Sequence, residues 1–271
     1  MVSGWNKNCG NIDEHSMNPE QTNNTSAMPQ RCGNRSWDSR LVGFTLIELL
    51  VVISIIGILA SLVLSVSGAV SRKARESRIR SEMNRLVTLI DNYKARLGTY
   101  PPSNERLVVS PPATRAQLAG LNQLYYELSG TVFKVDTFIP IGREAQAGLG
   151  AAQITSIFGV DGFANSARNP RDVRVSTAFK PSERKMVKEG ASVFESLAVP
   201  LAVASGDRVP PSVLLLTAAD GTKVYPWFYD PSSTNRFNAE TYDLWAEVVI
   251  GKNITRISNW EPRSVVIGKV P

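Results

Sequence analysis

An apolar run of 23 residues, Phe44–Val66, constrains this chain more than any other feature. Glu48 is its only charged residue, and the polar side chains that follow it are three serines, at Ser54, Ser61 and Ser65. At about 1.5 Å per residue, a helix of this length reaches about 34 Å, which is enough to span a bilayer. The run therefore predicts a transmembrane helix and disfavours a buried helix of a soluble core.

Glu48 is the anomaly in this run. A carboxylate at bilayer depth costs about 2.5 kcal/mol or more unless a partner compensates for it. Because nothing else in the run is charged, we expect the partner to come from another chain or from a new N-terminus. Cleavage after Gly43 would give Phe44 a free ammonium group about one helical turn from Glu48, or near the Glu48 of a neighbouring subunit.

The stretch from Gly43 to Glu48, GFTLIE, together with the apolar run, resembles the class III signal of type IV prepilins and type II secretion pseudopilins. The resemblance implies cleavage after Gly43 by a prepilin peptidase and methylation of the new amine on Phe44. It also implies that Glu48 aligns subunits in a helical filament. Residues 1–43 would then be a cytoplasmic leader that is removed, and the C-terminal head would lie in the periplasm, tethered to the inner membrane by a single pass.

Charge counting predicts the opposite orientation. Five cations follow the apolar run, and the positive-inside rule would place them in the cytoplasm. They are Arg72, Lys73, Arg75, Arg78 and Arg80. The peptidase signal is a specific requirement whereas the charge rule is a bias, so we follow the signal.

The leader is polar, rich in Asn, Ser and Gly, and low in hydrophobicity, so it is expected to be disordered. It holds the only cysteines and the only histidine, Cys9, Cys32 and His15. A redox pair or half of a metal site is one interpretation, and two free thiols in a removable leader is the one we adopt. The leader is longer than the usual form, so Met17 and Met28 are alternative starts.

The helix is predicted to continue beyond the apolar run, from residue 44 to about 97, with residues 67–98 as its soluble half. Apolar residues recur at spacings of 4, 3, 4, 3 and 4, which makes a seam along one helix face. The seam comprises Ile79, Met83, Leu86, Ile90, Tyr93 and Leu97. Packing on a globular head is the expected use of this seam, and a coiled coil is the alternative. Gly98 is the expected C-cap residue, because Pro101 and Pro102 cannot continue the helix.

Residues 99–222 are interpreted as a variable insert. Within it, 117–128 has helical spacing, 142–162 reads as loop, and 181–197 is predicted to hold short helical pieces. Strand character is found at 213–216 and at 223–229, on either side of the turn signal Asp220-Gly221.

The region 223–271 is predicted to be β-sheet. The stretch Leu86–Pro102 resembles the end of the long helix in the major pseudopilins, and residues 223–271 resemble the C-terminal sheet of that family. Those proteins bind calcium after an Asp-Leu pair. Asp243 matches the aspartate of this pair, but residues 248–256, which follow it, contain no carboxylate. Because calcium prefers several carboxylate ligands, we expect an ordinary half-buried hairpin here and no cofactor. The aromatic residues of the region are expected to pack in the core; they are Tyr225, Trp227, Tyr242, Trp245 and Trp260.

The sequence does not favour an enzyme. Beyond residue 43 the chain has neither cysteine nor histidine, which removes Ser/His/Asp and Cys/His mechanisms and thiolate or imidazole metal sites. The net charge of +6 is scattered, so no nucleic-acid surface is predicted.

We therefore expect an α+β, pilin-like fold, in which a long N-terminal helix, half of it transmembrane, packs on a small antiparallel sheet. The expected function is a structural subunit of a filament, most simply a pseudopilin of type II secretion. Its partners would be its own copies, minor pseudopilins, the prepilin peptidase and the inner-membrane assembly platform. The alternatives are a type IV pilus pilin for adhesion, motility or DNA uptake, and a membrane-tethered periplasmic enzyme or binding module.

Overall fold

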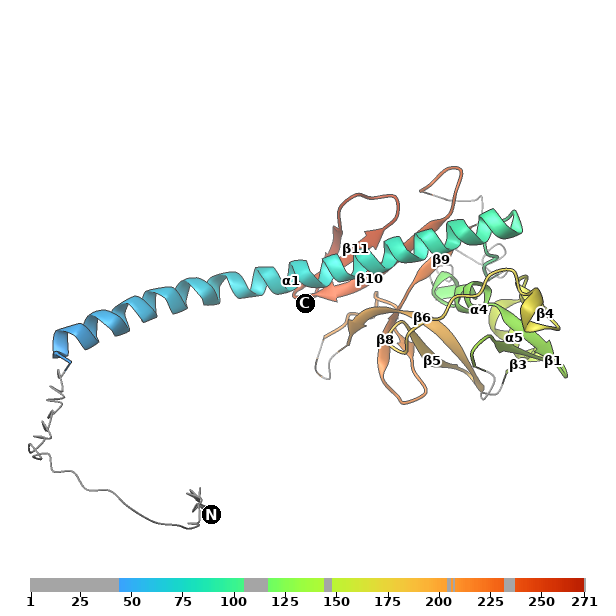
Figure 1. Cartoon of the computed structure of the whole chain (residues 1–271), viewed down its shortest axis with the longest axis horizontal. Coiled ribbons are helices and arrows are strands. Elements are labelled where there is room, and N and C mark those ends of the chain that lie inside the picture. The colour runs from blue at the N-terminus through green and yellow to red at the C-terminus, as the bar shows by residue number, and fades with distance from the viewer. Residues whose placement is uncertain are drawn as a thin grey trace, which may run out of the picture. The chain divides into compact units, whose positions relative to one another are not determined.

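The computed structural model describes residues 44–104, 117–143, 148–203, 206, 208–231 and 237–270, without the side chains of 62–67 (Figure 1). The expected leader, including Gly43, Cys9, His15 and Cys32, lies outside these residues. The chain divides into two compact units, residues 1–53 and 54–271.

A single helix, α1 (Leu46–Leu97), accounts for the N-terminal part of the described chain. It ends as predicted, because Gly98 adopts φ +86° and its N–H donates to the Lys94 carbonyl at 2.8 Å. A left-handed residue at this position suits glycine, which has no Cβ to clash.

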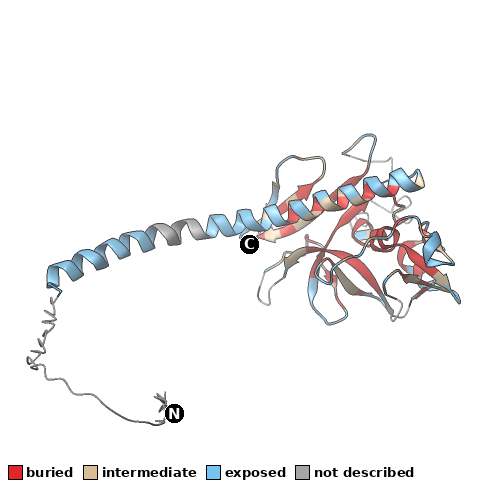
Figure 2. Cartoon of the chain, viewed as in Figure 1, coloured by how far each residue is buried: buried red, intermediate tan, exposed pale blue. Residues whose placement is uncertain are grey.

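The predicted seam on α1 is buried against the head. Ile79, Met83, Leu86, Ile90 and Tyr93 are each at most 2% exposed, and Leu97 is half-buried (Figure 2). These side chains belong to the same hydrophobic cluster as residues of the head strands, including Leu244 and Ile257. The coiled-coil interpretation of this seam is therefore wrong: the seam packs on its own chain.

The C-terminal region forms a four-stranded antiparallel sheet in the order β12-β11-β10-β9. Its strands are β9 (Phe228–Asp230), β10 (Asp243–Ile250), β11 (Asn253–Ser258) and β12 (Val265–Lys269). Along β10, buried and half-buried residues alternate from Leu244 onward, which confirms the expected half-buried hairpin. Tyr225, Trp227 and Tyr242 are at most 2% exposed, and Trp245 and Trp260 are half-buried and pack edge to face, so the expected core role of the aromatics is confirmed.

A second sheet has the order β5-β6-β8-β7, with β5 (Arg184–Glu189), β6 (Ser192–Ala202), β7 (Leu216–Thr217) and β8 (Lys223–Pro226). The helical pieces predicted at 181–197 are wrong, because β5 and β6 form an antiparallel hairpin there. Lys, Glu and Met favour helices locally, but β6 is buried over six consecutive residues, and burial between two strands overrides propensity. The turn at Asp220-Gly221 and the strand at 223–226 are confirmed, whereas the expected strand at 213–216 is reduced to Leu216–Thr217.

A third sheet, β3-β2-β1-β4, is built from β1 (Thr131–Lys134), β2 (Thr137–Pro140), β3 (Leu149–Gly150) and β4 (Ser166–Ala167), and its β1–β4 pair is parallel. Two short helices, α4 (Leu124–Ser129) and α5 (Ala151–Phe158), and a 3₁₀ turn, η1 (Pro170–Asp172), accompany it. Helix α5 lies where a loop was predicted, since Ile154, Ile157 and Phe158 supply an apolar face that the small residues around them obscured.

The α+β class is confirmed, with a long N-terminal helix and antiparallel sheets. The expectation of one small sheet understated the head, because the described residues form three sheets of four strands each.

Candidate functional site

The N-terminus of α1 is organised by Thr45 and Glu48. The Glu48 carboxylate accepts hydrogen bonds from the Thr45 N–H at 2.9 Å and from the Thr45 hydroxyl at 2.7 Å. The Thr45 hydroxyl oxygen in turn accepts from the Glu48 N–H at 3.3 Å. This reciprocal arrangement is a capping box, in which an N-cap threonine and a glutamate three residues later satisfy backbone N–H groups that a helix start leaves free.

The capping box corrects one part of the sequence reasoning. Glu48 was expected to find its partner only in another chain or in a new N-terminus, but within this chain Thr45 already supplies two donors. The signal was present in the sequence as Thr-x-x-Glu immediately before an apolar run. The structure does not test cleavage after Gly43, methylation of Phe44 or the assembly role of Glu48, and these stay predictions.

The N-terminal part of α1, with Phe44 before it, exposes apolar side chains on every side. Within residues 44–53, Phe44, Leu46 and Ile47 are 70–81% exposed, and Leu49–Ile53 are 45–58% exposed. Within the second unit, Ile55, Ile56, Ile58 and Leu59 are each more than half exposed (Figure 2). Soluble proteins rarely leave so large a contiguous apolar surface uncovered, so this segment requires a partner.

No helix in the part of the chain that the structure describes combines the length and the apolar character that crossing a membrane requires. The transmembrane half of the expected fold therefore stays a prediction.

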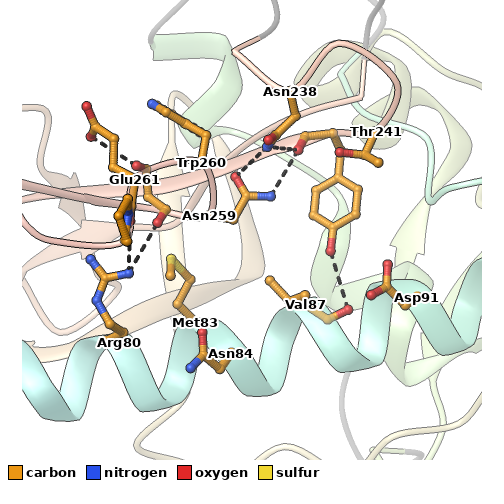
Figure 3. Close-up of a pocket in the computed structure, with 13 residues that line it drawn as sticks. Arg80, Met83, Asn84, Val87, Asp91, Asn238, Thr241, Asn259, Trp260 and Glu261 are labelled. Atoms are coloured by element: carbon orange, nitrogen blue, oxygen red, sulfur yellow. Dashed lines mark hydrogen bonds between the residues drawn. The ribbon is translucent and has the colours of Figure 1, made fainter.

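The second half of α1 is fastened to the head along a groove of about 450 Å³ (Figure 3). Arg80 rises from the helix and its Nη1 donates to the Glu261 carbonyl at 3.2 Å. The Tyr242 hydroxyl donates to the Val87 carbonyl of α1 at 3.3 Å. These bonds hold the helix against the two loops at the open end of the β10–β11 hairpin, where β10 begins and β11 ends.

A buried carboxylate makes a third attachment. Glu127 of α4 is 0% exposed, and it accepts from the Tyr93 hydroxyl of α1 at 2.8 Å and from the N–H groups of Ala164 and Asn165 at 2.8 and 2.9 Å. Burial raises the pKa of Glu127, although these three donors favour the charged form. Nothing in the sequence pattern singled out Glu127, because its importance depends on three segments that meet only in the fold.

Asp243, the residue that matches the calcium-binding pattern, accepts hydrogen bonds from the backbone. Its two carboxylate oxygens accept from the N–H groups of Phe237 and Asn238 at 2.8 and 2.9 Å. The Asn238 and Asn259 amides both donate to the Tyr242 carbonyl, which closes the loop between β9 and β10 on its C-terminal side. Among the residues for which placement is given, no group of three or more His, Cys, Asp or Glu side chains is arranged to hold a metal ion.

Comparisons with known proteins agree with the N-terminal geometry. A family model described as "Prokaryotic N-terminal methylation motif" matches residues 43–64, which contain the capping box and the exposed apolar segment. The fimbrial protein EcpB of Eikenella corrodens is 39% identical over 83 residues, which cover 30% of this chain and 51% of that protein. The chain thus matches about half the length of this curated relative, and no solved structure shows significant similarity. The motif, its place at the start of α1 and the similarity to a fimbrial protein together support a likeness to type IV pilin-like proteins.

Proposed function

We propose that the protein is a structural subunit of a pilin-like filament, cleaved after Gly43 by a prepilin peptidase and methylated on Phe44. The observation that carries the proposal is the apolar segment of α1, capped by Thr45 and Glu48 and exposed on all sides, which is joined to a folded head. Such a segment is suited to two environments in turn, the inner membrane and the apolar centre of a bundle of identical helices.

Within a filament, Glu48 would act as a register device. A carboxylate in an apolar bundle is costly without a partner, so a subunit would dock best where its neighbour's Phe44 ammonium meets Glu48. The Thr45 donors occupy this carboxylate in the isolated chain at 2.7–2.9 Å. A carboxylate has about four lone-pair sites, so it can accept from Thr45 and from a neighbouring ammonium together.

A pseudopilin of a type II secretion system is the finer assignment that we favour. It is supported by the resemblance of Leu86–Pro102 and of residues 223–271 to the major pseudopilins. A type IV pilus pilin is the second candidate, and the likeness to a fimbrial protein supports it.

N-terminal mass spectrometry of the membrane-extracted protein, expressed with a prepilin peptidase, tests the processing step. The expected first residue is methylated Phe44. Gly43→Val should abolish cleavage, whereas Gly57→Ala is the matched control, because a Cβ at Gly57 meets nothing within 4 Å. A mature chain that retains Arg40–Gly43 would contradict the proposal.

Electron microscopy with antibodies to the head separates the two filament types. Short filaments confined to the periplasm, with secretion lost on deletion of the gene, are expected for a pseudopilin. Long surface filaments with secretion intact would identify a pilus. If the processed protein assembles into neither kind of filament, a membrane-tethered enzyme or binding module is the remaining interpretation.

A further inference from the structure

Basic side chains from three elements converge at one end of the head. Arg72 and Lys73 of α1 line a groove of about 220 Å³ together with Asn253 at the start of β11. A Cβ added at Gly251, in the β10–β11 turn, would lie 3.4 Å from the Arg72 side chain, so this turn lies beside Arg72. Asn253 is also the cross-strand partner of Lys269 in β12.

Five exposed cations lie on these neighbouring segments, and we call this set the basic collar. It consists of Arg72, Lys73 and Arg75 of α1, Lys252 of the β10–β11 turn and Lys269 of β12. None of the five forms an ion pair with any residue that the structure describes. Glu76 is the one carboxylate among the residues that line the grooves on this side of α1, and it accepts from the Ser264 hydroxyl at 2.7 Å.

Apolar side chains accompany the collar. Val266 of β12 lines the same groove as Arg72 and is 54% exposed, and Val70 of α1 is 58% exposed. Unpaired cations beside exposed aliphatic groups are the composition of surfaces that bind the interface of an anionic membrane.

The position of the collar along α1 fits that use. Arg72 follows the end of the apolar run at Val66 by six residues, which is about 9 Å along a helix. The headgroup layer on each side of a bilayer is about 5–8 Å thick, and an arginine side chain can reach back toward it. The turn that carries Lys252 lies beside Arg72 and is therefore at the same level of the helix.

We propose that the basic collar binds the phosphate groups of anionic phospholipids at the membrane surface while the subunit awaits assembly. This inference rests on the proposed function, because it requires the apolar run to be in the membrane. It also accounts for the cations that follow the run against the positive-inside rule: they belong to a lipid-binding surface that is completed by the head.

The test uses the full chain in lipid nanodiscs made of phosphatidylcholine and phosphatidylglycerol in a 70:30 mixture. Lipid that stays with the detergent-extracted protein is then counted by mass spectrometry. The wild-type protein should retain phosphatidylglycerol several-fold over its share of the mixture, and this enrichment should fall with added salt, because the collar is exposed. The triple variant Arg72→Gln, Lys73→Gln, Lys252→Gln should lose most of it.

A control variant matches the change in charge elsewhere on the head. Arg208, Lys134 and Lys188 are exposed and lie outside the collar, so Arg208→Gln, Lys134→Gln, Lys188→Gln should keep the wild-type enrichment. Equal loss in both variants, or no enrichment in the wild-type protein, would overturn the inference. A collar variant that keeps the lipid preference but forms no filaments would also overturn the inference. That result would mean that the collar binds an acidic protein surface.

The same samples separate this inference from the proposed function. N-terminal mass spectrometry reports whether Phe44 is the methylated first residue, and it does not depend on the collar. Correct processing without lipid enrichment refutes the collar alone, whereas unprocessed protein refutes the filament assignment.

Discussion

The Tyr93 hydroxyl of α1 donates a 2.8 Å hydrogen bond to the Glu127 carboxylate of α4, and both side chains are 0% exposed. The bond crosses the boundary between the long helix and the head, so it attaches α1 to α4. Removing one partner of a buried hydrogen bond leaves the other partner without that bond and costs about 1–3 kcal/mol.

Tyr93→Phe should therefore lower the free energy of unfolding of the head by about 1–3 kcal/mol. Thermal unfolding of the detergent-solubilised chain, followed by near-ultraviolet circular dichroism, measures the change. Tyr100→Phe is the matched control, because Tyr100 packs against Tyr242 and Lys94 through its ring, which phenylalanine retains. Equal effects of the two substitutions would show that the Tyr93 bond contributes nothing specific.

The Glu127 carboxyl should make stability depend on pH in an uncommon direction. Burial raises its pKa above the ordinary value of 4.5, so the folded state binds this proton more tightly than the unfolded state does. The contribution is complete below pH 4.5 and is lost as the pH rises through the folded pKa. Glu127→Gln removes this dependence, which amounts to about 1.4 kcal/mol for each pH unit between the unfolded and the folded pKa.

Melting temperatures of the wild-type protein and of Glu127→Gln, taken from pH 7.5 down to 4.5, check this. The wild-type protein should gain stability relative to the variant as the pH falls. Glu189→Gln changes an exposed carboxylate beside the β5–β6 turn, and its melting temperature should change with pH as that of the wild type does. A wild-type protein that loses stability relative to Glu127→Gln on acidification would mean that the three donors outweigh burial.

Glu48→Ala should abolish filament formation while cleavage and membrane insertion persist, because the residues at the cut are unchanged and the segment becomes more apolar. Glu48→Asp should retain part of the assembly. Thr45→Ala removes the hydroxyl of the capping box, which costs about 1 kcal/mol of helix stability, but it leaves the Glu48 charge. Filament yield should therefore fall far less than in Glu48→Ala.

Immunoblotting for processed protein, together with filament counts or a secretion assay, reads out these variants. Ser61→Ala is the control within the same segment, since its hydroxyl donates only to the Ile58 carbonyl of its own helix. Wild-type assembly by Glu48→Ala at normal protein levels would refute the register role. Equal defects in Thr45→Ala and Glu48→Ala would assign Glu48 to helix capping alone.

Calcium should have little effect on the stability of the head. Both oxygens of Asp243 already accept from backbone N–H groups, and 248–256 brings no carboxylate to the site. We expect the melting temperature to be the same in millimolar calcium and in a chelator, and Asp243→Asn to destabilise the loop in both. A large rise with calcium that the chelator reverses would show a metal site.

Local patterns in the sequence are sufficient for several elements. The 4-3-4-3-4 spacing identifies the buried face of α1, Gly98 its end, and Asp220-Gly221 the turn before the strand at 223–226. Each of these depends on residues close together in the chain, where helical or strand periodicity and the conformational freedom of glycine decide the outcome. The apolar run and Glu48 likewise indicate a pilin-like subunit, because the signal that they form is contiguous in the sequence.

Long-range contacts decide the rest. Residues 184–197 form a hairpin because β6 pairs with β5 on one side and β8 on the other, and no local propensity reports that burial. The Tyr93–Glu127 bond joins residues 34 positions apart, and the basic collar joins α1 to β12 across most of the chain. A sequence records which side chains are charged or apolar, but only the packing of distant segments determines which charges are buried together and which stay exposed without partners.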